Sequence, residues 1–135
     1  MSWFNRIVQN PPPAVPLADD FAAIKLAAEG LLYPSETDAP FFPFKWPAIA
    51  GLTAREAVES HARGEAIESL PLEAFFTSLS DTEDAARYAH LRDVMTRQLP
   101  KWEVFRAGKV RIAIYLIGQT RTGEWIGLQT ESVET

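Results

Sequence analysis

One stretch near the C-terminal end of the sequence constrains the fold more than any other. Within residues 109–119, apolar side chains occupy both alternating sets of positions. One set runs from Val110 to Leu116 and the other from Ala113 to Ile117, so both faces of a strand here would be apolar. A strand of this kind usually lies inside a sheet whose two faces are both covered. The stretch therefore predicts a central strand packed between two other layers.

The segments around this strand supply the remaining elements. Strands are also predicted at Trp102–Arg106 and Trp125–Ser132, joined to the central strand by turns that contain Gly108 and Gly123. Helices followed by mostly antiparallel C-terminal strands predict an α/β (α+β) fold, arranged as a three-layer α/β/α sandwich. The helical spacing of apolar residues is found at Phe21–Leu31, Ala57–His61, residues 71–79 and Tyr88–Leu99.

Three local signals indicate where elements begin. Thr53–Glu56 and Ser80–Glu83 both have the Ser/Thr-x-x-Glu spacing of a capping box, which predicts a helix start at each. Phe41–Trp46 is aromatic and partly alternating, but Pro43 has no N–H to donate to a sheet. That segment is therefore predicted to be a short strand or an edge strand.

A proline-rich stretch separates the N-terminal residues from the rest of the 135-residue chain. Residues 11–16 read Pro-Pro-Pro-Ala-Val-Pro, which favours an extended polyproline II spacer. We expect an N-terminal arm at residues 1–16 and a single domain at residues 17–135. The apolar side chains of the arm, including Trp3 and Phe4, would dock on the domain itself or on a partner.

The charge balance limits the classes of partner. Lys and Arg number 13 and Asp and Glu 18, so the chain has a formal net charge of −5 and repels the phosphate backbone of nucleic acids. The same charge attracts a basic protein. The sequence has no cysteine for a disulfide or thiolate site and no apolar run long enough to cross a bilayer. We expect a cytoplasmic protein that binds neither nucleic acid directly nor a membrane.

The sequence contains no recognisable catalytic constellation. His61 and His90 both lie in predicted helices, and neither has a second ligand at a metal-binding spacing. Nothing resembles a nucleophile elbow or a glycine loop that cradles phosphates. We therefore expect no enzyme activity, no cofactor and no metal site of the chain's own.

Two further features carry a family resemblance. The first is a loop at residues 33–40, in which Glu36 lies between Ser35 and Thr37, and the second is the end of the chain at Glu134-Thr135, close behind the last predicted strand. Taken alone, the loop is a turn and the other feature is a strand end. The chain resembles the nuclease A inhibitor family in these two features and in Gly30-Leu31-Leu32, Pro40-Phe41, Phe75-Phe76, Val104-to-Gly108 and Tyr115-to-Thr120, over most of residues 18–135.

The resemblance implies a fold and an inhibitory mechanism. The family has an α/β/α sandwich of the pathogenesis-related-protein type and blocks a sugar-non-specific nuclease of the ββα-metal class. Glu36 matches the loop glutamate that reaches the catalytic groups of the nuclease, and Thr135 matches the terminal threonine that approaches the nuclease's metal. Ser35, Thr37 and Glu134 flank these positions and are expected to contact the nuclease too. The inhibitor alone is expected to be a monomer.

The connection before the last predicted helix departs from the family pattern. A family member carries an acidic, aromatic loop there, whereas this chain passes from Phe76 to Asp81 through four residues without a tryptophan. Helix capping explains Asp81, Glu83 and Asp84, and Asp81 is also a candidate contact with the partner. The departure leaves open a second interpretation, an interaction module of the same fold with a different partner. A third, an uncharacterised enzyme, has no assembled site in the sequence.

Overall fold

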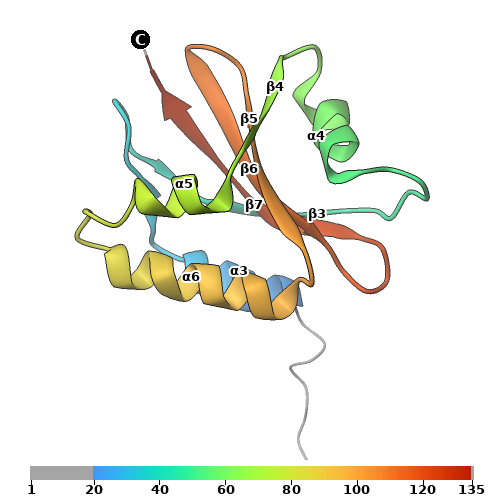
Figure 1. Ribbon diagram of the computed structural model, residues 1–135, viewed down its shortest axis with the longest axis horizontal. Coiled ribbons are helices and arrows are strands. Elements are labelled where there is room, and N and C mark those ends of the chain that lie inside the picture. Colours follow the sequence, from blue (N-terminus) through green and yellow to red (C-terminus); the bar gives the residue numbers. More distant parts are fainter. Residues whose placement is uncertain (1–19, 135) are drawn as a thin grey trace, which may run out of the picture.

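The structure is a computed structural model that describes residues 20–134, and it confirms an α+β fold (Figure 1). This part of the chain forms four helices, a five-stranded antiparallel sheet and a separate two-stranded hairpin. The elements in chain order are α3 (Asp20–Ala28), β1 (Leu32–Tyr33), β2 (Ala39–Pro40), β3 (Phe42–Trp46), α4 (Ala54–Ala62), β4 (Ile67–Leu70), α5 (Leu72–Thr77), α6 (Ala85–Gln98), β5 (Trp102–Ala107), β6 (Arg111–Gln119) and β7 (Trp125–Val133).

The strand predicted to be central is β6. The strand order of the sheet is β3-β7-β6-β5-β4, and every neighbouring pair is antiparallel. The β6–β7 pairing extends from Arg111 opposite Val133 to Gln119 opposite Trp125. Because β7 runs the full length of this pairing, its last residues reach the end of the sheet where the β1–β2 hairpin also lies (Figure 1).

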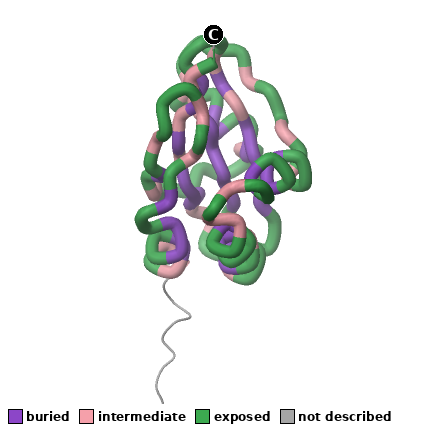
Figure 2. The backbone as a smooth tube through the Cα atoms, turned by 90° about the vertical axis from the view of Figure 1, so that its left-hand side faces the viewer, coloured by how far each residue is buried: buried purple, intermediate pink, exposed green. Residues whose placement is uncertain are grey.

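One face of the sheet carries the larger part of the core. Ile24 of α3, Phe75 of α5 and Leu91 of α6 are at most 1% exposed and belong to one cluster with the sheet. Full burial of a side chain of this size contributes roughly 1.5–3 kcal/mol. Figure 2 shows the buried strands enclosed by more exposed segments. The same cluster includes Phe41 and contacts Tyr33, so the β1–β2 hairpin packs against this core.

The opposite face of the sheet packs against α4. Val58 of α4 is fully buried in a second cluster with Tyr115 and Ile117 of β6. The two clusters take alternate residues of β6, as its two apolar faces predict. At the margin of this cluster the ring of His61 stacks on Trp46, with 3.5 Å between ring centroids. His61 therefore has a packing role here.

Two of the three boundary signals are confirmed. At the start of α4, the Glu56 N–H donates to Thr53 Oγ1 at 3.1 Å and the Thr53 N–H donates to Glu56 Oε1 at 2.9 Å, which completes a capping box. The segment with Pro43 forms β3, which lies at an edge of the sheet. An edge strand has unpaired positions on its outer side, so the missing N–H of proline costs no sheet hydrogen bond there.

The third signal is wrong. Ser80–Glu83 does not start the last helix, because α6 begins at Ala85 and its N-cap residue, Asp84, makes no side-chain capping bond. The hydroxyls of Ser80 and Thr82 instead donate backward to the carbonyls of Thr77 and Leu79, at 2.7 and 2.8 Å. Local bonds of this kind compete with capping, and here they continue the turn that follows α5.

Two other details differ from expectation. Val110, expected on an apolar face of the central strand, precedes β6 and is 56% exposed. β4 is not predicted at all, because its two middle residues are polar and it lies at the second edge of the sheet. Within residues 20–134, no helix is long and apolar enough to cross a membrane.

Candidate functional site

The loop that contains Glu36 is the tip of the β1–β2 hairpin. Leu32 pairs with Pro40 and Tyr33 with Ala39, which leaves residues 34–38 as the connection. Side chains of the core elements bind both strands of the hairpin. The Tyr88 hydroxyl of α6 donates to the Leu32 carbonyl, and Thr130 Oγ1 of β7 donates to the Pro40 carbonyl at 3.0 Å. Hydrogen bonds from α6 and β7 therefore fix the two strands that carry the tip.

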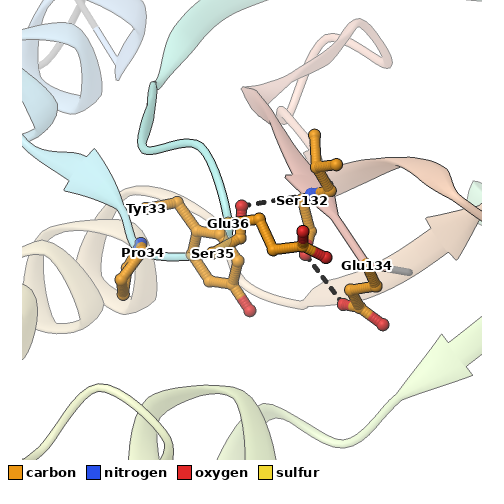
Figure 3. Close-up of a pocket in the computed structure, with 7 residues that line it drawn as sticks. Tyr33, Pro34, Ser35, Glu36, Ser132 and Glu134 are labelled. Atoms are coloured by element: carbon orange, nitrogen blue, oxygen red, sulfur yellow. Dashed lines mark hydrogen bonds between the residues drawn. The ribbon is translucent and has the colours of Figure 1, made fainter.

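The Ser35 hydroxyl joins this tip to the end of β7. The Val133 N–H donates to Ser35 Oγ at 3.1 Å (Figure 3), and the Glu36 N–H donates to the Val133 carbonyl at 3.4 Å. Ser35 Oγ also donates to the Thr37 carbonyl at 2.9 Å, which closes the tip on itself. Two segments separated by 98 residues in the sequence thus form one surface.

A shallow pocket of about 340 Å³ marks the place where the two segments meet. The exposed carboxylate of Glu36 and that of Glu134 both border it, and Figure 3 shows the Glu36 side chain extended toward the end of β7. An acidic opening suits a positively charged group of a partner, and one of its two carboxylates, that of Glu134, is paired with Arg106. The pocket is lined by Tyr33, Pro34, Ser35, Glu36, Ser132, Val133 and Glu134.

Glu134 is held in place by three other residues. Arg106 Nη2 of β5 lies 2.9 Å from both carboxylate oxygens, and Ser132 Oγ donates to Oε2 at 2.7 Å. The Glu134 N–H donates to the Val110 carbonyl at 2.9 Å. The hydrogen bond from Ser132, followed by that from Arg106, lowers the pKa of the Glu134 carboxyl below its usual value. Glu134 is consequently an ionised and oriented group.

Tyr33 forms an aromatic wall of the pocket. Its ring stacks on Phe75 of α5 with 5.6 Å between centroids, and the edge contact with Phe41 has a centroid distance of 6.3 Å. Burial raises the pKa of the Tyr33 phenol above its ordinary value, so the hydroxyl stays protonated near neutral pH. The pocket therefore combines two carboxylates with a neutral hydroxyl.

The hairpin tip and the end of β7 both lie within a match to a known protein family. A model of the nuclease A inhibitor-like protein family matches residues 19–135. The chain belongs to the nuclease A inhibitor-like family. The match covers both the hairpin tip and the end of β7, and it begins just after the predicted N-terminal arm. No curated protein matches the chain.

Four of the six predicted site residues of this inhibitor-like chain lie together. Ser35, Glu36 and Glu134 line the pocket, and Thr37 is bonded to Ser35 within the same tip. Asp81 is exposed in the connection between α5 and α6 and is not among the pocket-lining residues. The sixth residue, Thr135, and the arm at residues 1–16 lie outside the described residues.

Three residues that support this site were not predicted from the sequence. Thr130 and Ser132 are buried polar residues of β7, at 3% and 2% exposure, and Arg106 lies on β5. The sequence does contain a signal for Thr130 and Ser132, because they continue the alternating inward-facing positions of Ile126 and Leu128. Polar side chains on such positions need a hydrogen-bond partner, so they indicate a nearby loop or chain end. In the described part of the chain, no group of three or more His, Asp or Glu side chains could hold a metal ion.

Proposed function

We propose that this chain inhibits a sugar-non-specific, divalent-metal-dependent nuclease by occluding its active site with Glu36 and Thr135. The single observation that carries the proposal is the pair of hydrogen bonds between the hairpin tip and Val133. They bring the glutamate loop beside the strand whose sequence continues to Thr135, in a chain that belongs to the nuclease A inhibitor-like family.

The chemistry of the two groups suits the active site of such a nuclease. A centre of this type holds a hard divalent cation and basic residues, and magnesium prefers oxygen ligands while leaving positions open for substrate. Thr135 supplies a hydroxyl and main-chain oxygens, and Glu36 supplies an exposed anion. The pair would imitate the charge of a phosphate without offering a bond that the enzyme can cleave.

The remaining properties of the proposed inhibitor follow from its charge. A formal net charge of −5 favours a basic nuclease as partner and disfavours direct contact with nucleic acid. We propose a non-enzymatic, cytoplasmic protein that is monomeric when alone and needs no cofactor. We also propose that its helices and sheet form the three-layer sandwich of the pathogenesis-related-protein type, since the helices of the two core clusters lie against opposite faces of the sheet.

One observation favours a second candidate function. The connection from α5 to α6 is short, and Asp81 does not line the pocket with Glu36. A chain with this surface alone could bind a different protein through the hairpin tip. Recovery of a partner without nuclease activity, by a pull-down that requires Glu36, would favour that candidate.

The proposal is tested by an inhibition titration against a magnesium-dependent nuclease of the ββα-metal class. We compare the unmodified chain with one extended by a short peptide after Thr135 and with one that carries the same peptide before Met1. Only the extension after Thr135 is expected to abolish inhibition, because it would prevent Thr135 from entering the active-site cleft. Circular dichroism checks that all three proteins fold. Equal potency of the two extended proteins would rule out the mechanism.

A further inference from the structure

The last described residue of the chain is held by more bonds than its position after a strand requires. Glu134 follows β7, where many chains are loosely held. Here its carboxylate receives Arg106 Nη2 at 2.9 Å and Ser132 Oγ at 2.7 Å, and its N–H donates to Val110. Side-chain and main-chain bonds together restrain both the position and the direction of the chain at this point.

Arg106 reaches Glu134 from a strand that is not adjacent to β7. Arg106 belongs to β5, and β6 lies between β5 and β7 in the sheet. The ion pair therefore bridges the central strand. Of the five ion pairs in the described part of the chain, this pair has the least exposed basic side chain, with 26% of the Arg106 side chain accessible. The Glu134 side chain is 49% exposed, so its orientation comes from the bond geometry, in which Arg106 Nη2 lies 2.9 Å from both carboxylate oxygens and Ser132 Oγ donates to one of them.

We propose that Arg106 is a positioning residue of the inhibitory surface, which acts through Glu134 to hold the end of β7 beside the hairpin tip. This inference rests on the proposed function, because it assigns Arg106 a part in presenting the surface formed by Glu36 and Glu134 to a nuclease. Ser132 assists as the second side chain on the Glu134 carboxylate. A segment that is already ordered before binding loses less conformational entropy on association, so the complex lasts longer.

Positioning and simple charge attraction predict opposite effects of removing Arg106. Loss of one positive charge makes the net charge of −5 one unit more negative. A basic nuclease would then associate faster if only long-range charge mattered. If Arg106 positions the chain end, inhibition instead becomes weaker, and the loss is found in the dissociation rate. The sign of the change therefore separates the two explanations.

Arg111 provides a matched control. It lies on β6, next to the strand of Arg106, and its Nη1 forms an ion pair of 2.9 Å with Glu131. That pair does not involve Glu134, and the Arg111 side chain is 72% exposed. Arg106→Met and Arg111→Met remove the same charge and keep a long apolar side chain. They differ in whether Glu134 loses its partner.

The first measurement uses the free inhibitor. Backbone nitrogen relaxation is measured at residues 132–134 in the unsubstituted chain, Arg106→Met and Arg111→Met. We expect the Glu134 amide to become markedly more mobile in Arg106→Met alone, with the order of β5 and β6 unchanged. Unchanged order at Glu134 in Arg106→Met would overturn the proposal, whether or not the chain inhibits a nuclease. If Arg106→Met fails to fold, the same measurement on Glu134→Gln replaces it, since that change removes the charge that Arg106 holds.

The second measurement is inhibition of a magnesium-dependent ββα-metal nuclease. Arg106→Met is expected to raise the inhibition constant about tenfold through faster dissociation, whereas Arg111→Met changes it less than about twofold. In a Glu134→Gln background, Arg106→Met should have little further effect, because both changes break the same contact. Tighter inhibition by Arg106→Met, or full additivity of the two changes, would contradict positioning. No inhibition by the unsubstituted chain would instead refute the proposed function against that nuclease, while the relaxation result still decides whether Arg106 orders Glu134.

Discussion

The hairpin tip at residues 34–38 and the connection at residues 78–84 both carry exposed acidic side chains and both contain residues predicted to contact a partner, yet these side chains are held in different ways. The bonds that support the tip join residues far apart in sequence, such as Val133 to Ser35 and Thr130 to Pro40, with separations of 98 and 90 residues. The side-chain hydrogen bonds of Ser78, Ser80 and Thr82 in the connection reach back only three residues.

An acidic loop becomes a specific binding surface only when its charged side chains have a fixed position. Leu79 packs in the core and anchors the connection, but the local bonds of Ser80 and Thr82 do not fix the exposed Asp81 relative to distant residues. Long-range bonds do fix the tip, so Glu36 lies in a set position beside the end of β7. Because a rigid surface loses less entropy on binding, we expect the tip to determine affinity and the connection to contribute little.

The largest expected difference is between Glu36→Ala and Asp81→Ala. Glu36→Ala should raise the inhibition constant about 30-fold or more, as for the loss of a binding hot spot worth about 2 kcal/mol. Asp81→Ala removes the same charge from the connection and should change the constant less than about twofold. Titrations against one nuclease at constant salt measure both. Equal losses would mean that charge, and not the fixed position of Glu36, drives binding.

The anchor of the hairpin provides the next comparison. Thr130→Val removes the hydroxyl that bonds to the carbonyls of Ala39 and Pro40, and it should destabilise the fold by about 1–2 kcal/mol. Since β2 then loses a support, inhibition should weaken about fivefold. Thr82→Val is the control in the connection. Denaturant unfolding and inhibition assays report the two effects, and unaltered inhibition by Thr130→Val would show that the anchor does not matter for binding.

The serines of the two segments give a smaller effect. Ser35→Ala removes the acceptor for the Val133 N–H, while Ser80→Ala removes a donor to a carbonyl three residues away. Ser35→Ala should weaken inhibition about threefold, and Ser80→Ala should not change it measurably. Hydrogen exchange of the Val133 amide checks the cause. If the Val133 amide still exchanged slowly in Ser35→Ala, the Ser35 hydroxyl would not be the group that protects this amide from exchange.

The smallest effect concerns pH. The folded-state pKa of Glu134 is lowered, so the stability that its ionised form contributes is present above its ordinary pKa of 4.5 and is lost as the pH falls through the folded-state value. Solvent screening keeps the contribution below about 1 kcal/mol. The free energy of unfolding of the unsubstituted chain should thus exceed that of Glu134→Gln at pH 7, and acidification should close the gap. A gap that widens in acid would reverse the assigned sign.

Much of the fold could be predicted because it depends on local pattern. The two apolar faces around Ile114 and Tyr115 predicted a central strand, and Pro43 predicted an edge strand. β4 escaped prediction because an edge strand with Glu68 and Ser69 at its centre has no apolar alternation. The boundary at Ser80–Glu83 was wrong because the hydroxyls there had nearer acceptors than the first turn of α6.

The site residues also include some that the sequence predicted and some that it could not predict. Glu36 and Glu134 were predicted through the family resemblance and lie at one pocket. Arg106 could not be predicted, since its role depends on a bond across β6 that no spacing in the sequence reveals. The polar residues Thr130 and Ser132 on an inward-facing row were a readable signal, but their acceptors become apparent only in the folded chain.

The most direct test of the central claim is hydrogen exchange of the inhibitor with and without a magnesium-dependent ββα-metal nuclease. The account predicts that the nuclease slows exchange at residues 34–38 and at the end of β7 together, with little change at residues 78–84. Slower exchange confined to residues 78–84 or to α4, with the Glu36 and Glu134 amides unaffected, would contradict the claim that the hairpin tip and the end of β7 form one inhibitory surface.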